Sequence, residues 1–467
     1  AVGVVRLDAD DLDFGPQVLH VRRDTGDQAA AAHRDENRVQ RPRVLTQDLH
    51  RHGANLTKED ALTPAWLQDA GKPLMISMEE QNQVAMRVSD KGQALFFNVD
   101  TGAELKRVDL PLPTGATVAS IGEDQPGSPL VILGLSNGQS LVFRHTYKVS
   151  YPDGKKTISP AIEYPYGETP IVLDEQGLPL EHVALNATDS SLVVAGSSGA
   201  HLNVLSISRE ENMMTEEVTT EQKRIELPQM TEPVKAIFVD PRQQWLYVIN
   251  GRAQADVFSL RDKSLNGRYK LLEDGVAQVT ASTQLVGGIS LIIGNSSGGL
   301  AQWFMARDPD GEQRLKQIRT FQMGTAPIVE ITAEERRKGF TALDASGKFG
   351  VFHSTAHRTL LVDKVVDGTG VFGMSPRANR VIVEAGGKLQ PLLLDNPHPE
   401  VSWSALWSKV WYENYDEPKY VWQSTAANTD FEPKMSLAPL TFGTLKAAFY
   451  AMLLAAPLAV AAAIYTA

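Results

Sequence analysis

A repeated unit of short apolar strands and glycine turns constrains the fold of this chain more than any other feature. Between residues 70 and 400, an apolar strand, a gap, a second apolar strand, a tight turn and a third strand recur seven times. The turns are rich in Gly, Asn and Ser, and their glycines are Gly92, Gly138, Gly199, Gly251, Gly299, Gly347 and Gly387. Their spacings of 46, 61, 52, 48, 48 and 40 residues average about 49, which is the length of a propeller blade.

The repeat predicts an all-β fold, a seven-bladed β-propeller over residues 54–400. Each blade of a propeller is a four-stranded antiparallel sheet, and tight hairpins favour glycine because their turn residues need positive φ. A sandwich is the alternative, because short strands and glycine turns recur there too. The sevenfold register of a long period favours the propeller, although a Pro- and Tyr-rich insertion interrupts it between Gly138 and Gly199. The Trp-Asp and Gly-His signatures of WD40 propellers are absent from the repeat.

Composition and motifs argue against several classes of function. The chain has no cysteine, which excludes disulfides, thiolate metal sites and cysteine nucleophiles. Its net charge of −11 disfavours binding to nucleic acid. His353 and His357 form an H-x-x-x-H pair, but they follow a predicted strand and no Glu lies between them. The glycine-rich turns match no phosphate-binding loop. We therefore expect no metal, no cofactor and no enzymatic activity.

The segment of residues 1–53 differs from the rest of the chain. It holds four of the ten histidines and no lysine, and its apolar residues follow neither helical nor strand periodicity. Two interpretations stay open. The segment is either a disordered charged tail or non-native sequence, and we assign no function to it.

The C-terminal end of the chain is apolar throughout. Residues 447–467 contain no charge over 21 positions, which as a helix would rise about 31 Å and cross the hydrocarbon core of a bilayer. The alternative is a buried helix of a soluble protein, but such helices seldom lack charge around their whole circumference. Pro457 is tolerated inside membrane helices. We predict one transmembrane helix within residues 439–467.

An aromatic segment, residues 401–438, precedes this span. Trp403, Trp407 and Trp411 are spaced as one stripe of a helix, and Tyr412 follows. Such a stripe could pack on the propeller. Because Trp and Tyr concentrate at the boundary between water and lipid, we predict instead an interfacial helix with these four residues at the membrane surface.

Residues 431–467 resemble the start of the membrane domain of PstC-type permeases, subunits of phosphate-importing ABC transporters. That family has a P-(L/F)-x-x-G-T-L sequence, then an apolar helix with Pro-Leu in its middle and Ala-Ile-Tyr at its end. The matching residues are Pro439, Leu440, Gly443, Thr444, Leu445, Pro457, Leu458, Ala463, Ile464 and Tyr465. The chain also resembles a longer subgroup, from Gram-negative bacteria, with a large periplasmic β-propeller inserted between the first two membrane helices. The stretches 56–74 and 404–424 look like the two seams of that insert.

The resemblance implies a membrane-spanning permease component of an ABC importer for inorganic phosphate. It would lie in the bacterial inner (plasma) membrane, with the propeller in the periplasm as a docking or regulatory platform. The implied partners are a second permease subunit, a cytoplasmic ATPase subunit, a periplasmic phosphate-binding protein and membrane lipid. The family's other membrane helices have no counterpart here, so we expect a C-terminally truncated fragment with an atypical N-terminus.

Two alternatives remain beside the permease. One is a membrane-anchored periplasmic β-propeller scaffold without a transport role. The weaker one is a propeller enzyme of the quinoprotein kind, which would need a central-channel site that the sequence does not show.

Overall fold

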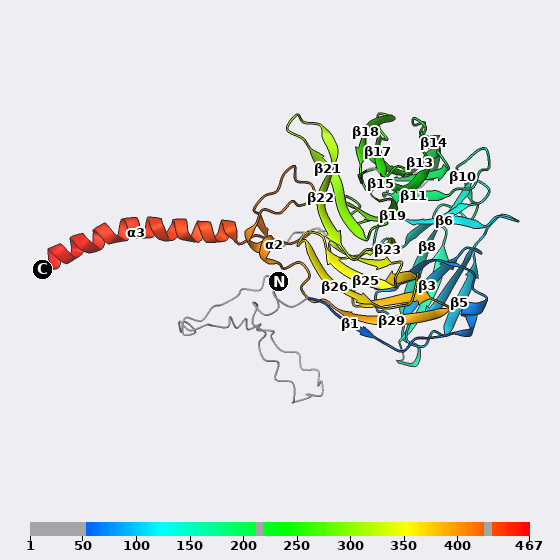
Figure 1. Ribbon diagram of the computed structural model, residues 1–467, viewed down its shortest axis with the longest axis horizontal. Helices are drawn as coiled ribbons and strands as arrows, with labels where there is room; N and C mark the ends of the chain where they lie inside the picture. Colours follow the sequence, from blue (N-terminus) through cyan, green and yellow to red (C-terminus); the bar gives the residue numbers. More distant parts are fainter. Residues whose placement is uncertain (1–52, 155, 212–217, 274, 276, 425–431) are drawn as a thin grey trace.

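Seven antiparallel sheets form the blades of a propeller in the computed structural model (Figure 1). The structure describes residues 53–467 except residues 155, 212–217, 274, 276 and 425–431. The predicted propeller and its seven blades are confirmed. Both interpretations of the N-terminal segment concern residues 1–52, which lie outside the described residues.

Each blade runs from an inner strand at the propeller axis to an outer strand at its rim. The inner strands are β2 (Pro73–Met78), β6 (Val118–Glu123), β11 (His182–Ala187), β15 (Val234–Val239), β19 (Val279–Gln284), β23 (Ile328–Ala333) and β27 (Val371–Met374). The second strands are β3 (Val84–Ser89), β7 (Leu130–Leu135), β12 (Ser191–Ser198), β16 (Trp245–Asn250), β20 (Leu291–Asn295), β24 (Gly339–Asp344) and β28 (Arg380–Ala385). The third strands are β4 (Gln93–Asn98), β8 (Gln139–Ser150), β13 (His201–Glu211), β17 (Gln254–Ser259), β21 (Gly299–Arg307), β25 (Lys348–His353) and β29 (Lys388–Asp395). The outer strands are β5 (Glu104–Asp109), β9 (Thr157–Glu163), β14 (Val218–Arg224), β18 (Ser264–Lys270), β22 (Gln313–Gln322), β26 (Arg358–Lys364) and β1 (Asn55–Lys58).

The insertion in the second blade lengthens a strand and leaves the number of blades unchanged. Strand β8 runs for 12 residues and pairs with β9 over its second half. Its first two residues pair with β10 (Ile171–Val172), so this sheet has five strands. A short 3-10 helix, η3 (Pro152–Gly154), lies between β8 and β9.

The hydrophobic core lies between neighbouring blades. All six residues of β3, β7 and β24 are buried, because a second strand has a blade packed on each face. One core cluster joins Met86 and Phe96 of the first blade to Leu133 and Phe143 of the second. The outer strands are more exposed, and β5 has one half-buried residue among six. The continuous apolar runs in the sequence correspond to this two-sided burial.

The propeller is closed by its seventh blade, which combines both ends of the repeat. Strand β1 pairs antiparallel with β29, with Asn55 opposite Asp395. Across the neighbouring seam, Arg87 of β3 donates hydrogen bonds of 2.7 and 2.8 Å to the Glu384 carboxylate of β28. Both side chains are buried, so the first and last blades share a buried ion pair. We did not predict β1, whose sequence NLTK carries little apolar pattern.

The turn glycines behave as predicted in five of the seven blades. Positive φ is found at Gly92, Gly138, Gly199, Gly347 and Gly387. The prediction is wrong for Gly251 and Gly299, because positive φ falls on Ala253 and Gly298 there. At Gly298 a side chain is also excluded, since a Cβ would lie 2.5 Å from the Gly324 carbonyl oxygen.

The C-terminal part leaves the propeller from one side. It contains a helix α2 (Trp403–Trp407), a small sheet of β30 (Trp422–Gln423) and β31 (Lys434–Met435), and the helix α3 (Ala438–Thr466). Another short 3-10 helix, η2 (Ala65–Gln68), follows β1 near the start of the propeller. Helix α3 has 29 residues, continues through Pro457 and projects away from the blades (Figure 1). Among the described residues it is the one helix long and apolar enough to cross a membrane.

A matched pair of glycine substitutions tests the turn geometry. Gly347 and Gly115 have nearly the same φ, +83° and +80°. A Cβ on Gly347 would overlap the Val366 carbonyl oxygen, whereas nothing lies within 4 Å of a Cβ on Gly115. We expect Gly115→Ala to lower the free energy of unfolding by about 1–2 kcal/mol, from φ strain alone. Gly347→Ala should cost about 3 kcal/mol or more, because the backbone must also move. Equal losses in urea unfolding would contradict this account.

Candidate functional site

The residues matched to the permease motif all lie on α3. Gly443, Thr444 and Leu445 are in its first half, and Pro457 and Leu458 are in its second half. All are exposed, and no part of the helix is buried against the rest of the described chain. These residues therefore share one helix, but they form no pocket with other described residues.

The aromatic segment differs from the predicted interfacial helix. Helix α2 is only five residues long, so Trp403 and Trp407 are on it and Trp411 and Tyr412 are not. The single helical stripe was therefore a wrong prediction. The Ser402 hydroxyl caps the start of α2 by accepting from the Ala405 N–H at 3.0 Å, and extended backbone at Ser408 ends the helix.

Contacts with the fifth blade explain why the helix ends before Trp411. The Trp411 ring packs edge-on against Phe304, with the ring centroids 6.1 Å apart. Its carbonyl oxygen accepts from Arg319 at 2.6 Å, and its indole N–H donates to the Tyr415 carbonyl at 2.8 Å. Tyr412 is buried, with 2% of its surface exposed. Tertiary packing thus draws Trp411 onto the propeller and buries Tyr412 in a small cluster within the C-terminal segment, with Ala405 and Val410, while Trp403 and Trp407 remain exposed.

Buried polar contacts hold this segment against the fifth and sixth blades. The Glu413 carboxylate pairs with Lys338 at 2.5 Å and accepts from the Ser290 hydroxyl at 2.6 Å. Lys338 also donates to the Val286 carbonyl at 2.5 Å. The Lys338 and Glu413 side chains are 6% and 8% exposed, so this ion pair is desolvated on both sides.

Further polar contacts extend the same interface. Arg319 bridges Gln302 of β21, at 2.7 Å, to the Trp411 carbonyl. Glu432 accepts from the Thr355 hydroxyl, and burial together with the charge of Glu413 raises the pKa of Glu432 to about 8. We call the interface formed by Ser290, Gln302, Arg319, Lys338, Trp411, Glu413 and Glu432 the polar clamp.

The chain enters and leaves the propeller at one place. The Arg358 guanidinium donates to the Val401 carbonyl at 2.6 Å, just before α2. A Cβ on Gly53, just before β1, would lie 2.7 Å from Nη2 of the same arginine. Both ends of the propeller therefore meet at Arg358.

Backbone contacts also tie the start of α3 to this region. The Leu437 N–H donates to the Leu406 carbonyl of α2 at 2.8 Å, and the Ser436 N–H donates to the Val421 carbonyl at 3.0 Å. Leu437 is the residue immediately before α3. Backbone hydrogen bonds thus fix the root of the apolar helix to the aromatic segment, and the polar clamp fixes that segment to the propeller.

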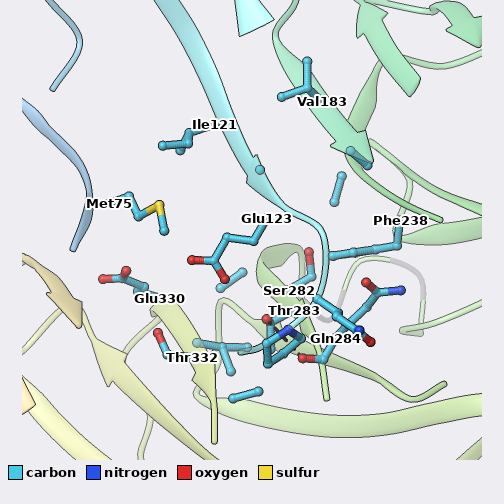
Figure 2. Close-up of a pocket in the computed structure, with 18 of the residues that line it drawn as sticks. Met75, Ile121, Glu123, Val183, Phe238, Ser282, Thr283, Gln284, Glu330 and Thr332 are labelled. Atoms are coloured by element: carbon cyan, nitrogen blue, oxygen red, sulfur yellow. Dashed lines mark hydrogen bonds between the residues drawn. The ribbon is translucent and has the colours of Figure 1, made fainter. Parts of the chain in front are cut away.

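A second feature, the central channel, contains a cavity of about 430 Å³ lined by the inner strands. Figure 2 shows the carboxylates of Glu123, from β6, and Glu330, from β23, facing the same space. Glu335 also lines this channel. Glu330 accepts from the Phe372 N–H at 3.0 Å. Within the described part of the chain, Glu123 and Glu330 form no ion pair.

The surrounding blades partly desolvate these carboxyl groups, although the Glu123 side chain remains accessible to solvent in the channel. Burial raises the pKa of Glu123 to about 7. Burial and the charge of Glu123 raise the pKa of Glu330 to about 8, against the lowering effect of the Phe372 N–H. The pKa of Glu335 rises to about 7 for the same two reasons, burial and Glu123, with the charge of Glu80 adding to them. Burial thus favours the protonated, uncharged form of these carboxyl groups near neutral pH.

The histidine pair does not meet in space as a metal site would require. His353 is buried, its Nδ1 accepts from the Ala356 N–H at 3.2 Å, and burial lowers its pKa to about 3. Nε2 of His357 hydrogen bonds instead to the Thr320 carbonyl at 2.9 Å. Over the described residues, no group of three His, Asp or Glu side chains is arranged to hold a metal ion.

Sequence reasoning missed both the polar clamp and the channel carboxylates. The basic run of residues 336–338 was the sequence feature that could have pointed to the clamp. The structure shows that Lys338, in this run, is buried. Glu123 and Glu330 end or interrupt otherwise apolar inner strands, which marks them as unusual once the strands are assigned.

Comparisons with known structures agree with the fold. The β-propeller domain of Cps50 (Swd1) from Myceliophteria thermophila aligns with a TM-score of 0.49 and 9% identity, over 73% of this chain and 99% of that chain. Raptor from Chaetomium thermophilum aligns with a TM-score of 0.50 and 13% identity, over 76% of this chain and 30% of that chain. At such identities the likeness shows the fold alone. No family model and no curated protein matches the chain. The class defined here is a β-propeller protein with one possible membrane helix.

Loss of one partner in the polar clamp should release the C-terminal segment. Lys338→Met leaves the Glu413 carboxylate buried without its counter-charge, which typically costs about 3–5 kcal/mol. We expect hydrogen exchange to speed up across residues 401–424 in the full chain. The control is Lys364→Met, because Lys364 pairs with Asp367 at an exposed site and should contribute less than about 1 kcal/mol. Unchanged exchange in Lys338→Met would show that the clamp does not hold the segment.

The channel carboxylates should make stability depend on pH. Because the pKa of Glu330 is about 8 in the folded state and its ordinary value is 4.5, the native state binds more protons between these values. The free energy of unfolding then falls as pH rises from about 5 to 8. In Glu330→Gln we expect a smaller decline of the free energy of unfolding with pH. At pH 8 the variant should be more stable than the wild type by about 1–2 kcal/mol, which is less than the whole pKa shift would give, because solvent in the channel screens the charge.

The control for this experiment is Glu221→Gln, which changes an exposed carboxyl on β14. Urea unfolding at pH 5 and pH 8 measures the difference for each variant. A Glu330→Gln profile parallel to that of the wild type would contradict the pKa shift.

Proposed function

We propose that this chain is the membrane-spanning part of an ABC importer permease for inorganic phosphate, with the propeller as a periplasmic docking or regulatory platform. One observation carries the architecture of this proposal. The two ends of the propeller, at Gly53 and Val401, meet at Arg358 beside the root of α3. A domain inserted between two membrane helices must begin and end on the side that faces the membrane.

The closure of the seventh blade supports an inserted domain. Strand β1, from the start of the propeller, completes the sheet formed by β27, β28 and β29. The domain is therefore self-contained between residues 55 and 400, and both seams leave it together. The placement of the propeller in the periplasm and of α3 in an inner membrane follows from the family resemblance.

The electrostatics of the channel favour docking over capture of phosphate. Glu123, Glu330 and Glu335 line the channel together with one lysine, Lys235, and any of these carboxyl groups that ionises opposes the approach of an anion. Phosphate would then be delivered by the periplasmic binding protein, and a second permease subunit and an ATPase subunit would complete the transporter. The substrate itself rests on the resemblance of Gly443, Thr444 and Leu445 to the permease motif.

A membrane-anchored scaffold without a transport role is the second candidate. It is favoured by the exposed helix α3, the one candidate span among the described residues, and by the polar clamp, which together suffice to present a propeller at a membrane. The two candidates agree on the anchor and differ in whether the membrane part conducts a substrate.

Phosphate uptake in cells separates the two candidates. Deletion of the complete gene should abolish uptake through this system, and the complete gene should restore it. We also propose an excision of residues 55–400 from the complete protein that joins Ala54 to Val401, because Arg358 brings these ends together. We expect this variant to reach the membrane but to lose binding-protein docking or regulation of import.

Each outcome of this experiment bears on one part of the proposal. Uptake that is unchanged after gene deletion would exclude the transporter and leave the scaffold. Normal import and normal regulation in the excised variant would exclude the docking platform. The matched control is the complete protein with Glu221→Gln, a change at an exposed position of β14 that should leave uptake unaltered.

A further inference from the structure

Four exposed aromatic side chains surround the root of α3. Trp403 and Trp407 on α2 are 50% and 43% exposed, and Tyr420 and Trp422 are 45% and 43% exposed. We call these four residues the aromatic collar. Large aromatic groups are costly to leave in water, because each can bury 150–250 Å² of surface. Their common location therefore needs an explanation.

Backbone pairing, and not chance proximity, places the collar beside α3. Leu406, next to Trp407, accepts the hydrogen bond from Leu437. Val421, between Tyr420 and Trp422, accepts from Ser436, and Trp422 itself pairs with Met435 of β31. Each of these bonds ends within three residues of the start of α3. The polar clamp holds the same segment, so the collar and the helix root are attached to the propeller together.

The dimensions of α3 fix where its root lies in a bilayer. Its 29 residues rise about 43 Å, more than the roughly 30 Å of hydrocarbon and close to the 40–45 Å that includes both headgroup layers. Leu440, Phe442 and Leu445, in the first two turns, are 43%, 70% and 65% exposed and need an apolar environment. The one charged side chain of the helix, Lys446, has its ammonium group 5.9 Å from the centroid of the Tyr450 ring, and in a bilayer its flexible stem allows it to turn back towards the headgroups.

We propose that the aromatic collar lies in the lipid headgroup layer and holds the fifth and sixth blades against the membrane surface. The occupant of this surface is the bilayer, because Trp and Tyr combine an apolar ring with a polar N–H or O–H and concentrate at that boundary. The inference rests on the proposed membrane anchorage by α3. It assigns the propeller a fixed orientation, with the seam at Arg358 facing the membrane.

The absence of cysteine from the chain allows a direct test with spin labels. Single Trp407→Cys and Trp422→Cys variants of the full chain are labelled with a nitroxide in vesicles of phosphatidylcholine and phosphatidylglycerol. Leu454→Cys on α3 reports the bilayer interior. Val172→Cys is the control, because Val172 is 47% exposed on β10, which lies on the side of the propeller away from α3 (Figure 1). Collision with oxygen, relative to a water-soluble nickel complex, measures depth.

We expect the oxygen-to-nickel ratio at positions 407 and 422 to exceed that at position 172 several-fold and to remain below that at position 454. Ratios at 407 and 422 equal to the control, with 454 in the bilayer, would overturn the inference and leave the anchor intact. A water-like ratio at 454 would overturn the anchor and the proposed function. Reduced collision with both reagents at 407 and 422 would indicate a protein contact and would also overturn the inference.

A second measurement uses native tryptophans and guards against misfolding of the cysteine variants. The unlabelled full chain is placed in vesicles that contain brominated phosphatidylcholine, which quenches fluorescence only at short range. We expect partial quenching that Trp407→Phe and Trp422→Phe reduce, while Trp303→Phe does not, because Trp303 is buried in the propeller. Quenching that none of the three variants alters would contradict the placement of the collar.

Discussion

Closure of the propeller ring determines where the two ends of the domain leave it. Strand β1 pairs with β29, and the buried Arg87–Glu384 pair joins the first blade to the last. Blades bury their second strands only when each has a neighbour on both faces, so an open ring would expose two apolar faces. The same closure brings Gly53 and Val401 to one arginine and so directs both ends of the domain to one side.

The sequence predicted the blades well because their signal is local. The second and third strands are apolar on successive residues and are separated by a turn with positive φ, and both features lie within about 20 residues. Strand β1 was missed because the four residues NLTK carry no such pattern and their partner, β29, lies more than 330 residues away. The shift of positive φ from Gly251 to Ala253 shows that even a local signal leaves the exact turn position open.

The functional regions were less predictable because they depend on contacts between distant segments. The spacing of Trp403, Trp407 and Trp411 is helical, but Arg319, 92 residues before Trp411, binds its carbonyl and ends that pattern. Lys338 and Glu413 are 75 residues apart, and each alone is an ordinary charged residue. Glu123 and Glu330 come from two blades, and only the propeller axis brings them to one channel. A pattern of residue types along the chain does not show which distant residues will contact one another in the fold.

The polar clamp couples the proposed docking platform mechanically to the root of the membrane helix. A flexible Gly/Ser linker would let the propeller move freely, and an event at the propeller could not change the helix. Here a desolvated ion pair, Lys338–Glu413, must break before the segment that carries the root of α3 can leave the blades, at a cost of about 3–5 kcal/mol. A partner that docks on the propeller could supply this energy only by binding the released arrangement about 10²–10⁴-fold more tightly than the clamped one. The propeller and the root of α3 should therefore move together, whether the membrane part transports phosphate or only anchors a scaffold.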